Sequence, residues 1–317
     1  MNKKRLLWLL VAGIFFAGCQ GAHPKITIAA SKNLWNSVPL IALDKGFFAE
    51  EGLDVTANYL DAGRFCMDAV LSKSADFGNV VDVNIGYLGY SKNTNVLLIN
   101  EISGCLASDI VARPSRGIHT PADIKGRSLA LSPGTTSDIF ARRFLRKYGI
   151  SIDSIKLVKI QPKGMVPAMA ADDGPDAAST WEPFVSSIKK ARGTDVITFE
   201  APDIYTAREF TAVRADWAKD NKDVIAAYQR ALKKAYDFSQ SHVEEAQAIV
   251  ARLTGLTPDV VKAAWAPYQI TFTYDKAKYL REITQIGQDI QEQPEYKGQG
   301  VPDYSKFIDD SYMPSSK

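Results

Sequence analysis

Short apolar segments of the kind that form β-strands alternate with helical stretches along this chain, and the alternating series occurs twice. The first series has strand-like segments at 25–30, 53–60, 75–78 and 95–100, and the second has them at 127–132, 155–160, 176–179 and 195–199. Strands that alternate with helices build parallel βαβ units. The pattern therefore predicts an α/β fold made of two βαβ sets.

Two lobes are expected, because extended segments near Ala112 and Val213 join the two sets. A discontinuous first lobe would comprise 24–112 plus 214–317, and the second lobe, 113–213, would be inserted into it. The length of 317 residues agrees with two domains of about 150 residues each. Helical patterns dominate after Val213, so C-terminal helices should complete the first lobe.

The segment 127–148 predicts a strand, a tight turn and the start of a helix. Pro133 ends the strand because it lacks a ladder donor, and Gly134 tolerates turn dihedrals. A helix start presents unpaired N–H groups and a partial positive charge, which favour a small anion or a polar head group. The residues of this candidate site are Ser132, Gly134, Thr135, Thr136 and Ser137. The alternative is a plain strand–turn–helix connection with an ordinary cap.

Other polar turns should lie beside this one, because ligands of open α/β sheets sit beyond the carboxyl ends of the strands. The turns at 31–37, 61–64, 79–82, 132–137 and 180–183 all follow predicted strands, so we expect them to face one cleft. The further candidates for binding a ligand there are Trp35, Asn36, Gly63, Arg64, Asn79, Trp181 and Glu182.

Several of these candidates have a structural alternative. Arg64 offers a guanidinium that could fork onto a sulfonate, carboxylate or phosphate, or it is a solvated charge at a helix start. Trp35 and Trp181 would form pocket walls or pack the edges of the lobes. Glu182 in the cleft would repel a simple anion and favour an amine, and opposite an anion-binding turn it would suit a zwitterion such as taurine. Glu182 could equally cap a helix or pair with a nearby lysine.

The N-terminus carries a positive segment, an apolar run at 6–16 and small residues before Cys19. This arrangement resembles a bacterial lipoprotein signal, which implies cleavage of 1–18 and a lipid on Cys19; the alternatives are a secretory signal without lipid and an uncleaved anchor. Without the three bases of that signal, 35 Lys and Arg face 36 Asp and Glu, a net charge of −1. Nothing in this balance points to nucleic acid.

Catalytic and metal-binding patterns have little support. Cys66 and Cys105 remain after Cys19, and they either pair as a disulfide in an oxidising compartment or are two small buried residues. They form no Cys-x-x-Cys pair and no Cys/His cluster, so we expect no metal site. The three histidines accompany no nucleophile motif. We expect neither a cofactor nor enzyme activity.

Five phrases in order, IALDKGFFAEEGLDV at 41–55, ADFG at 75–78, TPADIKG at 120–126, SPGTTS at 132–137 and DAASTWEP at 176–183, carry a family resemblance. Together they resemble the substrate-binding proteins of ABC importers for nitrate, sulfonates and taurine, a group that includes binders of thiamine-pyrimidine precursors. The match runs from Lys25 to Arg192. One departure is that the ligand loop, which often carries Ser-Gly in this family, has Gly63 followed by Arg64 here.

The resemblance implies a type II-like periplasmic-binding-protein fold, in which two lobes close on a small anionic or zwitterionic solute in a central cleft. It further implies a monomer that delivers the solute to the membrane permease of an importer. With the lipid anchor, the protein would sit in the cell envelope and face the periplasm or the cell exterior. The alternatives are a binder of a pyrimidine or another heterocycle, and a dehydratase of small aromatic acids, which the lipoprotein-like signal disfavours.

Overall fold

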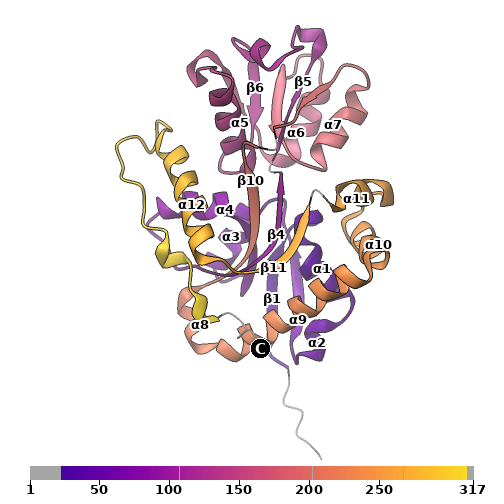
Figure 1. Ribbon diagram of the computed structural model, residues 1–317, viewed down its shortest axis with the longest axis vertical. Coiled ribbons are helices and arrows are strands. Elements are labelled where there is room, and N and C mark those ends of the chain that lie inside the picture. Colours follow the sequence, from indigo (N-terminus) through magenta and orange to yellow (C-terminus); the bar gives the residue numbers. More distant parts are fainter. Residues whose placement is uncertain (1–22, 107, 202, 267, 313–317) are drawn as a thin grey trace, which may run out of the picture.

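Two β-sheets, each covered by helices, form two lobes stacked one above the other (Figure 1). The computed structural model describes residues 23–106, 108–201, 203–266 and 268–312. The predicted signal and Cys19 lie outside these ranges. We call the six-stranded part lobe 1 and the five-stranded part lobe 2. Within the described ranges, no helix combines the length and the apolar character that crossing a bilayer requires.

Lobe 1 is built on a mixed sheet in the order β11-β4-β10-β3-β1-β2. Its strands are β1 (Lys25–Ala30), β2 (Asp54–Tyr59), β3 (Phe77–Val81), β4 (Leu97–Leu106), β10 (Thr206–Val213) and β11 (Gln269–Thr273). Its helices are α1 (Ser37–Asp44), α2 (Phe47–Glu50), α3 (Gly63–Leu71), α4 (Asp82–Gly89), α8 (Ala215–Asp220), α9 (Lys222–Ser241), α10 (Val243–Thr254), α11 (Pro258–Trp265) and α12 (Lys276–Gln291). As predicted, β1 is parallel to β2 and β3, whereas β10 and β11 pair antiparallel with their neighbours.

Lobe 2 is built on a smaller sheet in the order β7-β6-β8-β5-β9. Its elements are β5 (Asp109–Ala112), β6 (Ser128–Leu131), α5 (Thr136–Lys147), β7 (Lys156–Lys159), α6 (Met165–Ala170), β8 (Ala177–Thr180), α7 (Phe184–Arg192) and β9 (Ile197–Phe199). β6 is parallel to β7 and β8, as expected for βαβ units, and β5 is antiparallel to β8 and β9.

The chain passes between the two sheets earlier than the boundaries at 112 and 213 suggest. β5 belongs to the lobe 2 sheet, although we expected lobe 1 to run to Ala112, and β10 belongs to the lobe 1 sheet, although we expected lobe 2 to run to Val213. Both strands are extended and apolar, so the sequence marks them as crossings without saying which sheet supplies their hydrogen bonds. The sheets therefore change before Asp109 and before Thr206.

The two faces of the lobe 1 sheet pack into separate apolar clusters, because side chains alternate along each strand. In β4, Leu97 and Ile99 join one cluster while Leu98 joins the other. Cys105 belongs to the first cluster and Cys66 to the second, so the sheet lies between their side chains. The two cysteines are buried and no disulfide joins them. The disulfide alternative is therefore wrong, and the buried-residue alternative is confirmed.

The C-terminal part completes lobe 1, as predicted. Tyr228 of α9 stacks on Phe77 of β3 with a centroid distance of 3.8 Å. The polar tail also contributes to the core, because Tyr304 is buried and its hydroxyl donates to the carbonyl of Gly86 at 2.8 Å. Gly287 leaves room for that ring, since a Cβ there would lie 2.5 Å from the Tyr304 hydroxyl. Strand β11 was not predicted, because a short edge strand between helices carries little pattern of its own.

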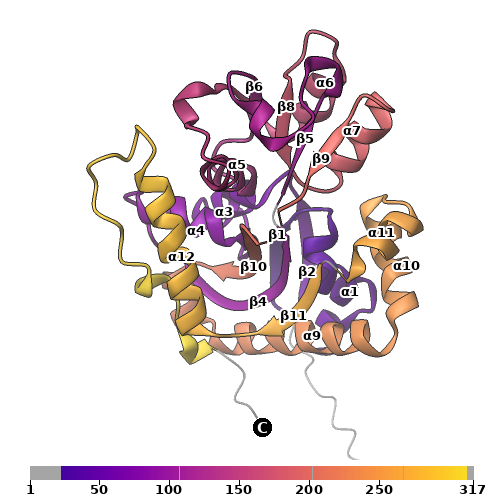
Figure 2. The same cartoon turned by 45° about the horizontal axis from the view of Figure 1, so that its top comes forward.

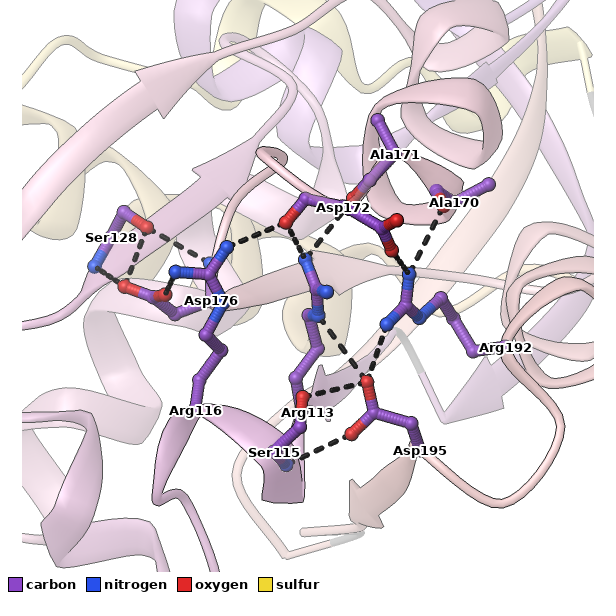
Figure 3. A network of polar contacts seen from close by, with 10 residues as sticks. All are labelled: Arg113, Ser115, Arg116, Ser128, Ala170, Ala171, Asp172, Asp176, Arg192 and Asp195. Atoms are coloured by element: carbon purple, nitrogen blue, oxygen red, sulfur yellow. Dashed lines mark hydrogen bonds and ion pairs between the residues drawn. The ribbon is translucent and has the colours of Figure 1, made fainter.

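Away from lobe 1, a network of arginines and aspartates ties the end of lobe 2 together (Figure 3). Arg113 follows β5 and donates to the backbone carbonyls of Ala171 and Asp172 at 3.1 and 3.2 Å. Asp195 accepts from the Ser115 amide at 2.9 Å and pairs with Arg192. Arg192 and Ser115 hold the pKa of the Asp195 carboxyl well below its usual range, although burial opposes them. The network therefore fixes the loops at this end of lobe 2 to one another.

Candidate functional site

The turn between β6 and α5 has the predicted strand–turn–helix geometry. Gly134 has a φ of +73°, in the left-handed region that suits glycine. Thr135 is the N-cap of α5, and its hydroxyl accepts from the Ser137 amide at 3.3 Å and donates to the Ser132 carbonyl at 2.7 Å. Ser137 in turn accepts from the Ser132 amide at 2.8 Å. These bonds fix the turn so that the N-terminus of α5 points at the gap between the lobes.

A pocket in that gap brings together residues from both lobes, and we call it the central pocket. Six predicted residues line it: Trp35, Gly63, Arg64, Thr135, Thr136 and Trp181. Ser31, Asn33, Asp61, Ala62, Val81, Val83, Asn84 and Glu209 complete the lining. Its volume is only about 30 Å³, which is room for about two waters. The pocket must therefore widen before a larger solute fits.

The two tryptophans bound this pocket from opposite lobes. Trp35 lies between β1 and α1, is buried, and meets the ring of Tyr268 edge-on at a centroid distance of 5.5 Å. Trp181 follows β8 and meets Phe184 edge-on at 5.4 Å. Each tryptophan therefore packs against its own lobe and also lines the pocket, so the packing alternative and the pocket-wall alternative each apply in part.

Arg64 bridges the lobes instead of standing free in solvent. Its Nη1 atom donates to the Pro133 carbonyl in the β6–α5 turn at 3.2 Å. The neighbouring Gly63 lets Asn84 of α4 pack against the start of α3, because a Cβ at position 63 would lie 2.7 Å from the Oδ1 atom of Asn84. The Nδ2 atom of Asn84 donates to the Gly134 carbonyl at 3.4 Å. Arg64 also lines a wider outer pocket of about 380 Å³ beside the central one, so it stands between the two spaces.

Asn36 and Asn79 do not reach the pocket surface and lie beneath it. Both are buried, and Asn79 donates through Nδ2 to the Oδ1 atom of Asn36. Asn36 then donates through Nδ2 to Glu209 at 3.4 Å. The two asparagines therefore support a residue that the sequence reasoning missed. The sequence feature that could have indicated this residue is a glutamate inside the apolar segment 209–213, for which the sequence analysis predicts only an extended conformation.

Glu182 does not line the central pocket. Its carboxylate accepts from the amide and the hydroxyl of Ser186 in the first turn of α7, at 3.1 and 3.0 Å. It borders a separate side pocket of about 490 Å³ near α11. The helix-capping alternative is therefore confirmed for Glu182, and the amine that we inferred from it has no support from this residue. Ser132 and Ser137 also lie outside the lining; the Ser132 amide donates to the Ser137 hydroxyl within the turn.

Two buried carboxyl groups in this region have strongly raised pKa values. Burial raises the pKa of Glu209 to about 8; the Asn36 hydrogen bond opposes this, and the negative charge of Asp82 adds to it. Burial likewise raises the pKa of Asp82 to about 7, against hydrogen bonds from Tyr205 and two backbone amides. Of the two, only Glu209 faces the central pocket. Among the described residues, no group of three or more His, Cys, Asp or Glu could hold a metal ion.

Helix α5 also connects the lobes away from the pocket. Arg143 donates through Nε to Asp289 of α12 at 2.6 Å, and Arg146 donates through Nη1 to the same carboxylate at 3.0 Å. Arg146 further pairs with Glu292 at 2.6 Å. In Figure 2, α5 is seen nearly end-on, with α12 and α4 beside it. One helix thus presents its N-terminus to the pocket and its middle to lobe 1.

Comparisons with known proteins agree with this geometry. A family model described as NMT1/THI5 like matches residues 37–246. The taurine-binding periplasmic protein of Escherichia coli is 22% identical over 240 residues, which is 74% of this chain and 71% of that protein. The periplasmic aliphatic sulphonate binding protein SsuA of Escherichia coli has the same fold, with a TM-score of 0.77 and 19% identity over 92% of this chain and 94% of that one. The desulfurization enzyme DSZB is less similar, with a TM-score of 0.62 and 14% identity over 89% and 98% of the two chains.

Proposed function

The chain belongs to the NMT1/THI5-like family, and from that membership and the central pocket we propose that it is the solute-binding component of an ABC importer. It captures a small anionic or zwitterionic solute between its lobes and delivers it to a membrane permease. The observation that carries this proposal is the central pocket, where strand-end turns from two lobes meet around the N-terminus of α5.

The chemistry of the pocket favours a compact polar solute. The N-terminus of a 12-residue helix supplies partial positive charge and N–H donors, and Arg64 adds a guanidinium at the same edge. Sulfonate and carboxylate groups match such donors. The taurine and aliphatic sulphonate relatives bind solutes of this class, which supports the same class here.

Binding requires the lobes to separate and close again, since the pocket has room for about two waters. The crossings before Asp109 and Thr206 are the segments about which the lobes would turn, a hinge motion between two rigid units. The closed form would then dock on the permease. A lipid on Cys19 would hold the protein at the membrane, facing the periplasm or the cell exterior.

A second candidate solute is a flat heterocycle, such as a thiamine-precursor pyrimidine. Trp35 and Trp181 favour it, because both indoles line the central pocket and aromatic faces stack on planar rings. The same fold and the same closure would serve either solute.

A thermal-shift screen of the mature protein tests the proposal. Taurine, alkanesulfonates, nitrate and pyrimidines are each titrated, and a bound solute should raise the melting temperature in proportion to the logarithm of its concentration. A matched variant, Thr136→Arg, would fill the pocket and should abolish the shift. Turnover of a substrate, with no shift from any small polar solute, would refute a binding role.

A further inference from the structure

Glu209 occupies an unusual place for a carboxylate. It lies in the interior of β10, between Val81 of β3 and Ser103 of β4, and its side chain faces the central pocket with 2% of the residue exposed. The register of β10 against β4 shifts directly after it. The extra residue at this shift, Ile102, belongs to β4, and bulges of this kind are common beside functional sites.

The hydrogen bond that Glu209 receives from Asn36 would be too weak to compensate an ionised carboxylate there. Oε1 accepts from Asn36 at the long distance of 3.4 Å, and no donor among the described residues reaches Oε2. Arg64 lines the same pocket but donates to the Pro133 carbonyl instead. Asp82 of α4, Cys66 of α3 and Cys105 of β4 interact electrostatically with Glu209, and Asp61 and Arg64 line the same pocket. Of these groups only Arg64 is a cation.

We propose that Glu209 receives a cationic or N–H-donating nitrogen of the solute, and that it thereby selects amine-bearing solutes over simple anions. This inference rests on the proposed function and narrows the solute class. A buried acceptor that lacks a donor costs free energy, which a solute nitrogen restores. Trp35 and Trp181 line the same pocket, and their indole faces attract cations. The solute would thus place its anionic or polar head at α5 and its nitrogen at Glu209.

Proton exchange should accompany this recognition. Burial raises the pKa of Glu209 to about 8, so at pH 7 the carboxyl in the empty pocket carries a proton. A solute ammonium favours the carboxylate, because opposite charges attract strongly in a desolvated site. Glu209 then gives its proton to the solvent, and the ammonium keeps all of its own. Capture of a cationic amine near neutral pH should therefore release about one proton.

Matched solute pairs test this inference. Taurine is compared with ethanesulfonate, and 4-aminopyrimidine with pyrimidine, by calorimetry in two buffers of different ionisation enthalpy. The wild type should bind the amine-bearing member at least about tenfold more tightly, since hydrogen bonds to a charged group are stronger than those between neutral groups. Taurine should release close to one proton. Glu209→Gln should lose the preference and the proton release, whereas the exposed-site control Glu200→Gln should keep both.

The outcomes separate this inference from the proposed function. Equal binding of both members by the wild type, or a preference that persists in Glu209→Gln, would overturn the role of Glu209 and leave the binding function intact. If Glu209→Gln does not fold, the wild-type pairs and Glu209→Asp, which withdraws the carboxylate by one methylene, decide the question. If no member of either pair nor nitrate binds, the proposed function itself fails.

Discussion

Asp289 holds α5 of lobe 2 against α12 of lobe 1, so neutralising it should favour separation of the lobes. Its side chain is 7% exposed and accepts from Arg143 at 2.6 Å and from Arg146 at 3.0 Å. We consider the substitution Asp289→Asn, which preserves volume and leaves one oxygen to accept a hydrogen bond. Both arginines would lose the carboxylate when the lobes are together, and neither would lose anything when the lobes are apart.

The expected magnitude follows from the exposure of the partners. Removing one member of a buried ion pair costs about 3–5 kcal/mol. The Arg146 side chain is 52% exposed, so water solvates it and its pair with Asp289 contributes little of this free energy. The Arg143 side chain is only 17% exposed, so its pair with Asp289 contributes most of it. We therefore expect about 2 kcal/mol against the closed form, which is about 30-fold in the open–closed equilibrium.

Thiol-directed spin labels on cysteines that replace Lys190 of α7 and Lys262 of α11 would report the separation of the lobes. Both positions are exposed, and the two helices lie on the same side of the molecule (Figure 1). Cys66 and Cys105 should not take the label, because burial raises the pKa of both thiols. Asp289→Asn should increase the population of long distances and weaken solute binding. The control Glu292→Gln removes only a pair between two exposed side chains and should change neither. Distance distributions that coincide for wild type and Asp289→Asn would refute the reasoning.

Three further predictions concern stability. The unfolding free energy should fall as pH rises from about 4.5 to about 8. In this range Glu209 is ionised in the unfolded chain, whereas in the folded protein it keeps its proton because its pKa is about 8. Urea titrations of Glu209→Gln should show a flatter decline across that window. Gly63→Ala should destabilise by about 1–3 kcal/mol, since its Cβ would meet Asn84 at 2.7 Å, while Gly300→Ala, which meets nothing within 4 Å, should leave the melting temperature unchanged. Asp195→Asn should lower the melting temperature at pH 7 and have progressively less effect as pH falls below 3.8, the ordinary pKa of an aspartate, because the unfolded chain then takes up a proton that the folded Asp195 still resists; an equal loss at neutral and acidic pH would contradict this.

Much of the fold follows from periodicity that a single sequence displays. The helix at Thr136–Lys147 begins at a threonine cap and carries buried Phe140 and Phe144 at a spacing of four, and both features are local. The sheet to which β5 or β10 belongs is not local, because it depends on backbone pairing with strands far along the chain. That is why the two crossings were recognised while their assignment to the lobes differed.

In the candidate site, too, local features were predictable and features that depend on strand pairing were not. Turns at strand ends were predictable as a group, and the central pocket brings Trp35, Arg64, Thr135 and Trp181 together. Glu209 was missed because it lies within a strand, where a side chain is more often a packing residue than a ligand contact. The face of the sheet on which Glu209 lies depends on how β10 pairs with β3 and β4, and the sequence does not encode that pairing in any short motif.

The two sides of the gap between the lobes differ in charge, and this difference should decide how the lobes move apart. On the α12 side, Arg143 and Arg146 meet Asp289 across the gap. On the α11 side, the side pocket is lined by the carboxylates of Asp109, Glu182, Glu200 and Asp259, and no lysine or arginine is among its lining residues. Burial and then the charge of Glu200 raise the pKa of Asp109 to about 6, and the nearby Lys189 opposes them. Of the four carboxylates only Asp259 belongs to lobe 1, so the repulsion across the gap is between Asp259 and the carboxylates of lobe 2. Attraction on one side and repulsion on the other favour a wider opening at α11 than between α5 and α12, where a small separation already breaks the Asp289 contacts. The labels on α7 and α11 should therefore separate further than a pair placed on α5 and α12, and the opposite order would refute this asymmetry.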